Sequence, residues 1–166
     1  ARQRRELLAG DGKMMIIACD HPARGALSVG GAPDAMANRE DLLGRLVDAL
    51  DTPGVDGVLA TPDLIDDLVV LGALENKVVV GSLNRGGLSG ASFEMDDRFG
   101  CYTIPGIVEQ RLDAAKTLTR VNYEDAGTAA TLEATAHAVN EASQAKVPIM
   151  IEPFISRWEG GSIKND

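Results

Sequence analysis

Five short, dense apolar runs occur along the chain, and each is followed by polar residues and then by a segment with helical periodicity. The first run covers residues 14–19 and leads straight into Asp20, His21 and Pro22. Runs of this length and density are typical of strands buried on both faces, as in parallel sheets covered by helices. Parallel strands need long crossover connections, and the helical segments supply them. The pattern therefore restricts the chain to an α/β fold of repeated β-then-α units.

The limits of these units follow from the apolar periodicity and from Gly and Pro positions. The expected strands cover residues 14–19, 57–60, 77–83, 116–122 and 147–154. The expected helices cover residues 1–12, 39–50, 64–74, 104–114 and 128–145. The last of these should face the core with Leu132, Ala136 and Val139. Residues 84–103 form a long loop, a feature that is usually functional or mobile, and residues 156–166 are polar and show no periodicity.

Two α/β architectures fit five such units: an open doubly wound sheet and the first part of a (β/α)8 TIM barrel. The open sheet usually carries a Gly-rich phosphate turn after its first strand, but Asp20-His21-Pro22 stands there. The chain also stops soon after its fifth strand, whereas a complete barrel takes about 250 residues. We therefore predict a single α/β domain over residues 1–166, made of the first five units of a TIM barrel.

Composition excludes several kinds of function. The formal net charge of the 166 residues is −9, so nucleic acid is not an expected partner, because its binding requires a basic surface. No apolar run approaches the roughly 18–20 residues of a membrane span, and the polar N-terminus does not resemble a signal peptide. Cys19 and Cys101 do not make a disulfide framework. These features predict a soluble, cytoplasmic protein without membrane or nucleic-acid partners.

Polar side chains recur at the carboxyl ends of the expected strands. Side chains alternate between the faces of a strand, which places Asp20, Asn84, Arg120 and Glu152 in phase with inward-facing neighbours. In a barrel these four residues would surround one mouth, and Lys116 would lie deeper, near its floor. The mouth formed by the carboxyl ends of the strands is where barrel enzymes place their active sites.

Each of these residues has a structural interpretation beside the functional one. Lys116 suits amine or proton-transfer chemistry, because burial changes the basicity of an amine. It also suits a buried ion pair with Glu152 or Asp20. Arg120 is predicted either to contact substrate or to form a structural pair. For Asp20 the functional interpretation is favoured, because a charge at the end of so apolar a strand is costly.

The loops after the strands add four candidate substrate-binding residues. Arg24, Arg85 and Arg157 follow the first, third and fifth strands and have the chemistry to bind phosphate or carboxylate, although single loop arginines are usually solvated. His21 precedes Pro22, so its backbone is restricted and its role is either contact with substrate or shaping of the turn. The two histidines and two cysteines lack metal-ligand spacing, so we predict neither a metal nor a cofactor.

Four segments together resemble a known superfamily. ACDHPARGA, VVVGSLNRGG, KTLTRVNYED and PIMIEPF occur in this order, and they resemble the class I (Schiff-base) aldolases with (β/α)8 barrels. This superfamily contains the deoxyribose-phosphate, tagatose-bisphosphate and archaeal-type fructose-bisphosphate aldolases. The resemblance covers nearly the whole chain, and it is strongest to a bacterial branch often linked to inositol catabolism.

The resemblance implies a lysine that forms an imine with a keto-sugar phosphate. Asp20 and Glu152 match the family's proton-transfer positions, and Lys116 matches a strand-four lysine near the imine. The imine lysine itself is expected on strand six, beyond residue 166. The resemblance also implies no cofactor, a homo-oligomer, and 6-phospho-5-dehydro-2-deoxygluconate as a candidate substrate.

Two other hypotheses remain open at this stage. One is a sugar-phosphate-binding barrel or assembly subunit that performs no catalysis. The other is a barrel sugar-phosphate isomerase that uses Asp20 and Glu152 as acid and base without a covalent step.

Overall fold

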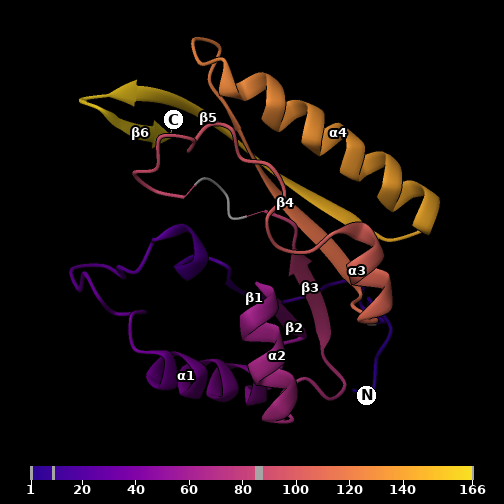
Figure 1. The fold of residues 1–166 in the computed structure, drawn as a ribbon. Helices are drawn as coiled ribbons and strands as arrows, with labels where there is room; N and C mark the ends of the chain where they lie inside the picture. The colour runs from indigo at the N-terminus through magenta and orange to yellow at the C-terminus, as the bar shows by residue number, and fades with distance from the viewer. Residues whose placement is uncertain (1, 9, 85–87, 166) are drawn as a thin grey trace.

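The computed structural model describes residues 2–8, 10–84 and 88–165. The strands of this part of the chain form a curled sheet with the order β1-β2-β3-β4-β5-β6 (Figure 1). They are β1 (Ile16–Cys19), β2 (Gly57–Ala60), β3 (Val78–Ser82), β4 (Ala114–Val121), β5 (Ile149–Glu159) and β6 (Ser162–Asn165). The first five strands run parallel in sequence order, whereas β6 is antiparallel to β5. The α/β fold expected from the apolar runs is therefore present.

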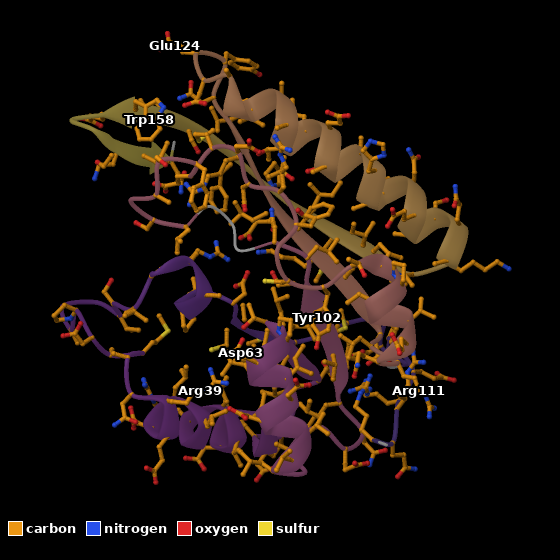
Figure 2. All side chains as sticks on the ribbon, viewed as in Figure 1. Arg39, Asp63, Tyr102, Arg111, Glu124 and Trp158 are labelled. Carbon is orange, nitrogen blue, oxygen red and sulfur yellow. The ribbon has the colours of Figure 1, made fainter. Side chains whose placement is uncertain are left out.

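The helices form the crossovers between the parallel strands and cover one face of the sheet. They are η1 (Pro22–Arg24), α1 (Arg39–Asp51), α2 (Pro62–Val70), α3 (Ile104–Glu109) and α4 (Gly127–Ala145). Side-chain caps explain where α1 and α3 begin. The Asn38 side chain accepts a hydrogen bond from the backbone amide of Asp41, and the Thr103 side chain accepts one from the backbone amide of Gly106. Arg39 ties α1 to α2 through Asp63, at 2.6 Å (Figure 2). No helix in the described ranges is long and apolar enough to cross a bilayer.

Alternate strand residues contribute to separate apolar clusters on the two faces. The larger cluster lies between sheet and helices and includes Val58, Val79 and Ala115 with helix leucines such as Leu46 and Leu68. The smaller cluster lies on the opposite face, which we call the inner face, and contains Leu59, Val78, Val80 and Ala114. The side chains therefore alternate as the sequence pattern predicts, and the polar residues in phase with the smaller cluster belong to the inner face.

The helix expected over residues 1–12 is wrong, because residues 2–8 contain no helix. Arginines from this segment bind acids at the opposite end of the sheet from the candidate site. Arg2 lies 2.6 Å and Arg4 2.7 Å from Asp113, and Arg5 lies 2.5 Å from Asp56. The segment thus gains its stability from ion pairs with distant residues rather than from its own helical propensity.

Residues 156–166 are polar and lack periodicity in the sequence, and no strand was predicted there, but the described residues of this segment form strands. β5 continues to Glu159 and forms a hairpin with β6, in which Trp158 pairs with Ile163. Gly160 and Gly161 connect the strands with φ angles of 59° and 79°, the backbone that a tight hairpin turn requires. Trp158 donates to Asp125 at 2.6 Å and joins the hairpin to the loop that carries Glu124 (Figure 2).

Two helices end earlier than expected, and one faces the core differently. α2 stops at Val70 before Gly72, whose φ is 72°, and α3 stops at Glu109 before Arg111, whose φ is 56°. Both left-handed residues end the helical hydrogen bonding. The buried residues of α4 are Thr128, Thr131, Thr135, Ala138 and Ala142. Leu132 and Ala136 are exposed, because hydrogen-bonded threonines occupy the inward positions instead.

Gly57 provides a test of the strand register. A Cβ at Gly57 would lie 2.0 Å from the carbonyl oxygen of Val78, whereas one at Gly44 in α1 would meet nothing within 4 Å. Gly57→Ala should therefore lower the free energy of unfolding by about 3 kcal/mol, because backbone must move. Gly44→Ala should raise it by roughly 0.5–1 kcal/mol. Urea denaturation followed by circular dichroism measures both, and equal stabilities would contradict the β2–β3 register.

Candidate active site

A buried ammonium group joins carboxylates from both ends of the parallel sheet. Lys116 Nζ lies 2.8 Å from Asp20 Oδ2 and 2.5 Å from Glu152 Oε2. Asp20 follows β1, Lys116 lies in β4 and Glu152 lies in β5. Because β1 is three strands away from β4 in the sheet, the Lys116–Asp20 contact crosses the hollow of the inner face. We call Asp20, Lys116 and Glu152 the Lys116 cluster.

The three members differ in their access to solvent. The side chains of Lys116 and Asp20 are each only 4% exposed, whereas that of Glu152 is 46% exposed. The cluster borders a cavity of about 400 Å³ that also reaches His21, Leu59 and Met150. A volume of this size accommodates a small organic ligand. Glu152 is thus the carboxylate most accessible to a ligand, and Asp20 lies behind it in the ion-pair network.

Three basic side chains surround the Asp20 carboxylate: Lys116, Arg24 and His21. Its Oδ2 accepts from Lys116 and from Arg24 Nη2, the latter at 2.5 Å, and its Oδ1 lies 3.7 Å from His21 Nδ1. Burial alone would raise the pKa of Asp20. The charge and hydrogen bond of Lys116, with the charges of Arg24 and His21, outweigh burial and hold that pKa below its ordinary value. Asp20 therefore remains an anion that orients two cations.

Asn84 lies on the inner face, where the sequence predicts it, and its amide group is bonded to the protein. Its Nδ2 donates to the carbonyl of Leu118 at 2.7 Å and to Asp97 Oδ2 at 3.0 Å, and its Oδ1 accepts from the amide of Leu118 at 3.0 Å. These bonds continue the pairing of β3 with β4 beyond the end of β3. Asn84 therefore fixes the strand that carries Lys116.

Arg120 lies further along β4 than Lys116 and is buried. Its Nη1 donates to Asn165 Oδ1 of β6 at 3.0 Å. Burial lowers the pKa of this guanidinium, the charge of Glu94 opposes that change, and the charge of Arg24 adds to it.

Two of the predicted arginines are not brought to the Lys116 cluster by any described contact. Arg157 is an exposed residue of the β5–β6 hairpin, 3.7 Å from Glu159. Arg85 lies outside the described residues. The substrate-binding roles of both residues remain predictions.

Two buried carboxylates on the long loop before α3 were not predicted from the sequence. Glu94 accepts from the amide of Gly90 at 3.0 Å, and Asp97 accepts from Asn84. Thr131 of α4 anchors this loop, since its hydroxyl donates to the carbonyl of Met95 at 2.7 Å and accepts from the amide of Asp97 at 2.9 Å. The unusual length of the loop was the feature that marked it in the sequence.

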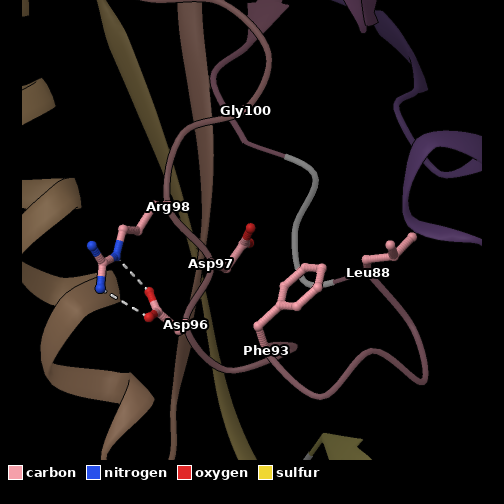
Figure 3. A pocket seen from close by; sticks show the side chains of 6 residues that line it. All are labelled: Leu88, Phe93, Asp96, Asp97, Arg98 and Gly100. Carbon is pink, nitrogen blue, oxygen red and sulfur yellow. Dashed lines mark hydrogen bonds and ion pairs between the residues drawn. The ribbon is translucent and has the colours of Figure 1, made fainter.

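The same loop borders a second, smaller cavity of about 290 Å³ (Figure 3). Leu88 and Phe93 give it an apolar side, and Arg98 is ion-paired with Asp96 at 2.7 Å on the other.

Within the described residues, no group of three or more His, Cys, Asp or Glu side chains is arranged to hold a metal ion. Cys19 and Cys101 form no disulfide, and burial raises the pKa of the Cys19 thiol to about 11. A thiol of that kind is a poor nucleophile near neutral pH.

Replacement of Lys116 tests what holds Asp20 ionised. Lys116→Met removes the charge with little change in shape, so the pKa of Asp20 should rise. The pKa of Asp20 is lower in the folded state than in the unfolded state, where it is about 3.9. Ionised Asp20 therefore stabilises the folded protein at pH values above the unfolded-state pKa, and this stability is lost as the pH falls through the folded-state pKa. In Lys116→Met, this loss on acidification should be smaller. Carboxyl ¹³C titration and urea unfolding at several pH values measure both effects.

Lys13→Met is the matched control, because Lys13 is exposed and has no described contact with Asp20. It should leave the titration of Asp20 unchanged. An unaltered Asp20 titration in Lys116→Met would contradict the proposed control of Asp20 by Lys116.

Comparison with known proteins identifies structures with a similar fold and the family of the chain. Among solved structures, Cgl0159 from Corynebacterium glutamicum (Brevibacterium flavum) has 63% sequence identity and a TM-score of 0.96. The match covers 99% of this chain and 56% of that chain, so the chain spans little more than half the length of its relative. A search of curated proteins finds no match.

A second solved structure shares the fold at much lower identity. A Schiff-base-forming fructose-1,6-bisphosphate aldolase matches with 20% identity and a TM-score of 0.57, over 90% of this chain and 55% of that chain. The likeness shows that the curled sheet is an α/β half-barrel like part of an aldolase barrel. The count of eight β/α units stays a prediction. Residues 12–166 match the Cgl0159-like family, and the chain therefore belongs to that family.

Proposed function

We propose that this chain supplies the proton-transfer residues of a class I aldolase that cleaves or forms a carbon–carbon bond in a keto-sugar phosphate. The observation that carries the proposal is Lys116, buried between Asp20 and Glu152 at a cavity of about 400 Å³. Buried, coupled acid–base groups at a cavity are typical of catalytic sites. The half-barrel fold and the motifs of the aldolase superfamily agree with this assignment.

Lys116 is assigned to proton transfer rather than to nucleophilic attack. In ion pairs with two carboxylates the amine is an ammonium group, which has no lone pair to add to a carbonyl. The imine lysine is therefore proposed to lie beyond residue 166 of the complete protein, on the sixth barrel strand, as the family resemblance implies.

The chemistry assigns Glu152 the role of mobile acid and base. In cleavage, Glu152 takes the proton from the substrate hydroxyl beside the scissile bond. The carbon–carbon bond breaks, its electron pair passes into the protonated imine to give an enamine, and the hydroxyl-bearing carbon leaves as an aldehyde. Glu152 then returns its proton to the enamine carbon, and hydrolysis releases the ketone. Lys116, which Asp20 holds in position, stabilises the negative charge of Glu152 between these steps.

The finer features of the proposal rest on the resemblance. The substrate is proposed to be 6-phospho-5-dehydro-2-deoxygluconate, which would give dihydroxyacetone phosphate and malonate semialdehyde. A cytoplasmic location and a homo-oligomeric assembly belong to the same proposal, as do the substrate contacts of His21, Arg24, Asn84, Arg85, Arg120 and Arg157.

A barrel isomerase is the second candidate function. Asp20 and Glu152 share one ammonium group at the same cavity, which is the arrangement an acid–base pair needs without a covalent step. A sugar-phosphate-binding barrel without catalysis is the third candidate.

Borohydride trapping separates these candidates. We expect the complete protein, treated with dihydroxyacetone phosphate and borohydride, to gain one reduced adduct on a lysine beyond Asp166, by intact mass and peptide mapping. Lys116→Met should keep the adduct at that lysine. An adduct on Lys116 would contradict its role as a proton-transfer residue. Binding of the sugar phosphate without any adduct would favour the isomerase or the binding protein.

Replacement of Glu152 tests its role directly. Glu152→Gln should slow cleavage by about 10²–10⁴-fold, the usual contribution of a general acid–base group, with little loss of stability because its side chain is partly exposed. Glu159→Gln, at an exposed carboxylate of the same strand, should retain the original rate. Rates are measured by coupled detection of dihydroxyacetone phosphate, and equal rates for the two variants would exclude Glu152 from catalysis.

A further inference from the structure

A single turn after β1 places Arg24 beside the Asp20 carboxylate. The turn is η1 (Pro22–Arg24), and Gly25 ends it in the left-handed conformation, with a φ angle of 78°. It brings Arg24 Nη2 to 2.5 Å from Asp20 Oδ2, four residues earlier in the chain. The backbone amide of Ser89 donates to the carbonyl of Arg24 at 3.0 Å, so the long loop before α3 also holds the turn. The backbone therefore fixes where the guanidinium group can reach.

The ion pair between Arg24 and Asp20 is almost closed to water. The Arg24 side chain is 11% exposed and the Asp20 side chain 4% exposed. Charges at this depth are poorly screened, and removal of one partner would leave the other partly uncompensated. Arg24 is therefore a strong and lasting counterion of Asp20.

The distances within the Lys116 cluster show what this counterion does. Lys116 Nζ lies 2.5 Å from Glu152 but 2.8 Å from Asp20, although the Glu152 side chain is the far more exposed of the two. Between otherwise equal carboxylates, the buried one should attract the ammonium more strongly, because water screens the exposed one. The carboxylates are not equal, since Asp20 Oδ2 accepts from Arg24 as well as from Lys116. Arg24 thus compensates part of the Asp20 charge, and the ammonium remains close to Glu152.

The count of charges leads to the same result. Asp20 and Glu152 carry two negative charges, and Lys116 and Arg24 carry two positive charges. Without Arg24, one ammonium would be shared by two carboxylates, and the buried Asp20 would hold it more strongly. His21 also faces Asp20, but its Nδ1 lies 3.7 Å from Oδ1, on the other carboxylate oxygen.

We propose that Arg24 is a positioning residue, which compensates the charge of Asp20 and thereby keeps the Lys116 ammonium available to Glu152. The inference rests on the proposed function, in which Glu152 exchanges protons with the substrate. Arg24 acts through Asp20 and Lys116 and need not touch the reacting atoms. This role explains how two carboxylates can share one ammonium while only Glu152 serves as acid and base.

Arg24→Met in the complete protein tests the inference. The kcat of cleavage should fall at least about tenfold, equivalent to about 1.4 kcal/mol, because Lys116 moves toward Asp20 and Glu152 loses its counterion. The KM should change little, because no ground-state contact with the substrate is removed. Arg98→Met is the control, since the Arg98 side chain is 71% exposed and pairs with Asp96. It should keep the wild-type kcat and KM.

The pH dependence provides a readout that a purely structural role would not change. Burial raises the pKa of Asp20, and the charges of Lys116, Arg24 and His21 lower it. Loss of Arg24 should therefore raise this pKa, so that activity is lost at a higher pH on acidification. Arg24→Lys keeps a positive charge near Asp20, and it should restore the acid limb of the wild-type profile and most of kcat.

A double variant tests whether Arg24 acts through Glu152. In the Glu152→Gln background the proton acceptor is already absent, so Arg24→Met should slow cleavage much less than it does in the wild type. Equal effects in both backgrounds would overturn the inference. A raised KM with unchanged kcat and acid limb would also overturn it, and would leave Arg24 as a substrate contact only.

Carboxyl ¹³C titration of the substrate-free protein separates this inference from the proposed function. Asp20 should titrate at higher pH in Arg24→Met than in the wild type and Arg98→Met. An unchanged Asp20 titration would overturn the role of Arg24 and leave the aldolase proposal intact. A shifted Asp20 titration in a protein that forms no imine would overturn the aldolase proposal and still support the control of Asp20 by Arg24.

Discussion

The ion pairs of Lys116 connect the two ends of the parallel sheet, and the arrangement of the inner face depends on them. Asp20 follows β1 and Glu152 lies in β5, yet both reach the same ammonium nitrogen, at 2.8 and 2.5 Å. A flat sheet would keep these strands far apart, since neighbouring strands lie about 4.8 Å from each other. The curl of the sheet and the burial of the charge therefore require one another. An ammonium at this depth would be costly without a carboxylate partner.

A layer of hydrogen-bonded polar side chains supports the cluster from the helix side and from the loop. Asn84 binds both backbone groups of Leu118, and through Asp97 it reaches the loop that Thr131 anchors to α4. Satisfied polar networks of this kind fix one arrangement of neighbouring elements. The helix face that would ordinarily be apolar is therefore occupied by threonines, and the loop with Glu94 and Asp97 takes a defined position over the inner face.

Strand positions and inward-facing residues were predictable from the sequence, because a period of two fixes which side chains share a face. That rule places Asp20, Lys116 and Glu152 on the same face of the sheet. The N-terminal segment, the β5–β6 hairpin and the buried face of α4 were not predictable in the same way. Each depends on partners distant in the chain. The N-terminal arginines bind Asp113, Trp158 of the hairpin binds Asp125, and Thr131 of α4 binds the loop at Met95. Local propensity carries no information about such contacts.

One carboxylate oxygen of Asp20 accepts hydrogen bonds from both Lys116 and Arg24. A shift of Arg24 away from Asp20 would leave this oxygen to Lys116 alone, which would strengthen the Asp20–Lys116 ion pair and weaken the attraction between Lys116 and Glu152. The network therefore couples the position of Arg24 to the charge balance of the Lys116 cluster. Because the side chain of Lys116 is only 4% exposed, little water is present to screen this coupling. The single shared oxygen of Asp20 thus links the position of Arg24 to the charges of Lys116 and Glu152.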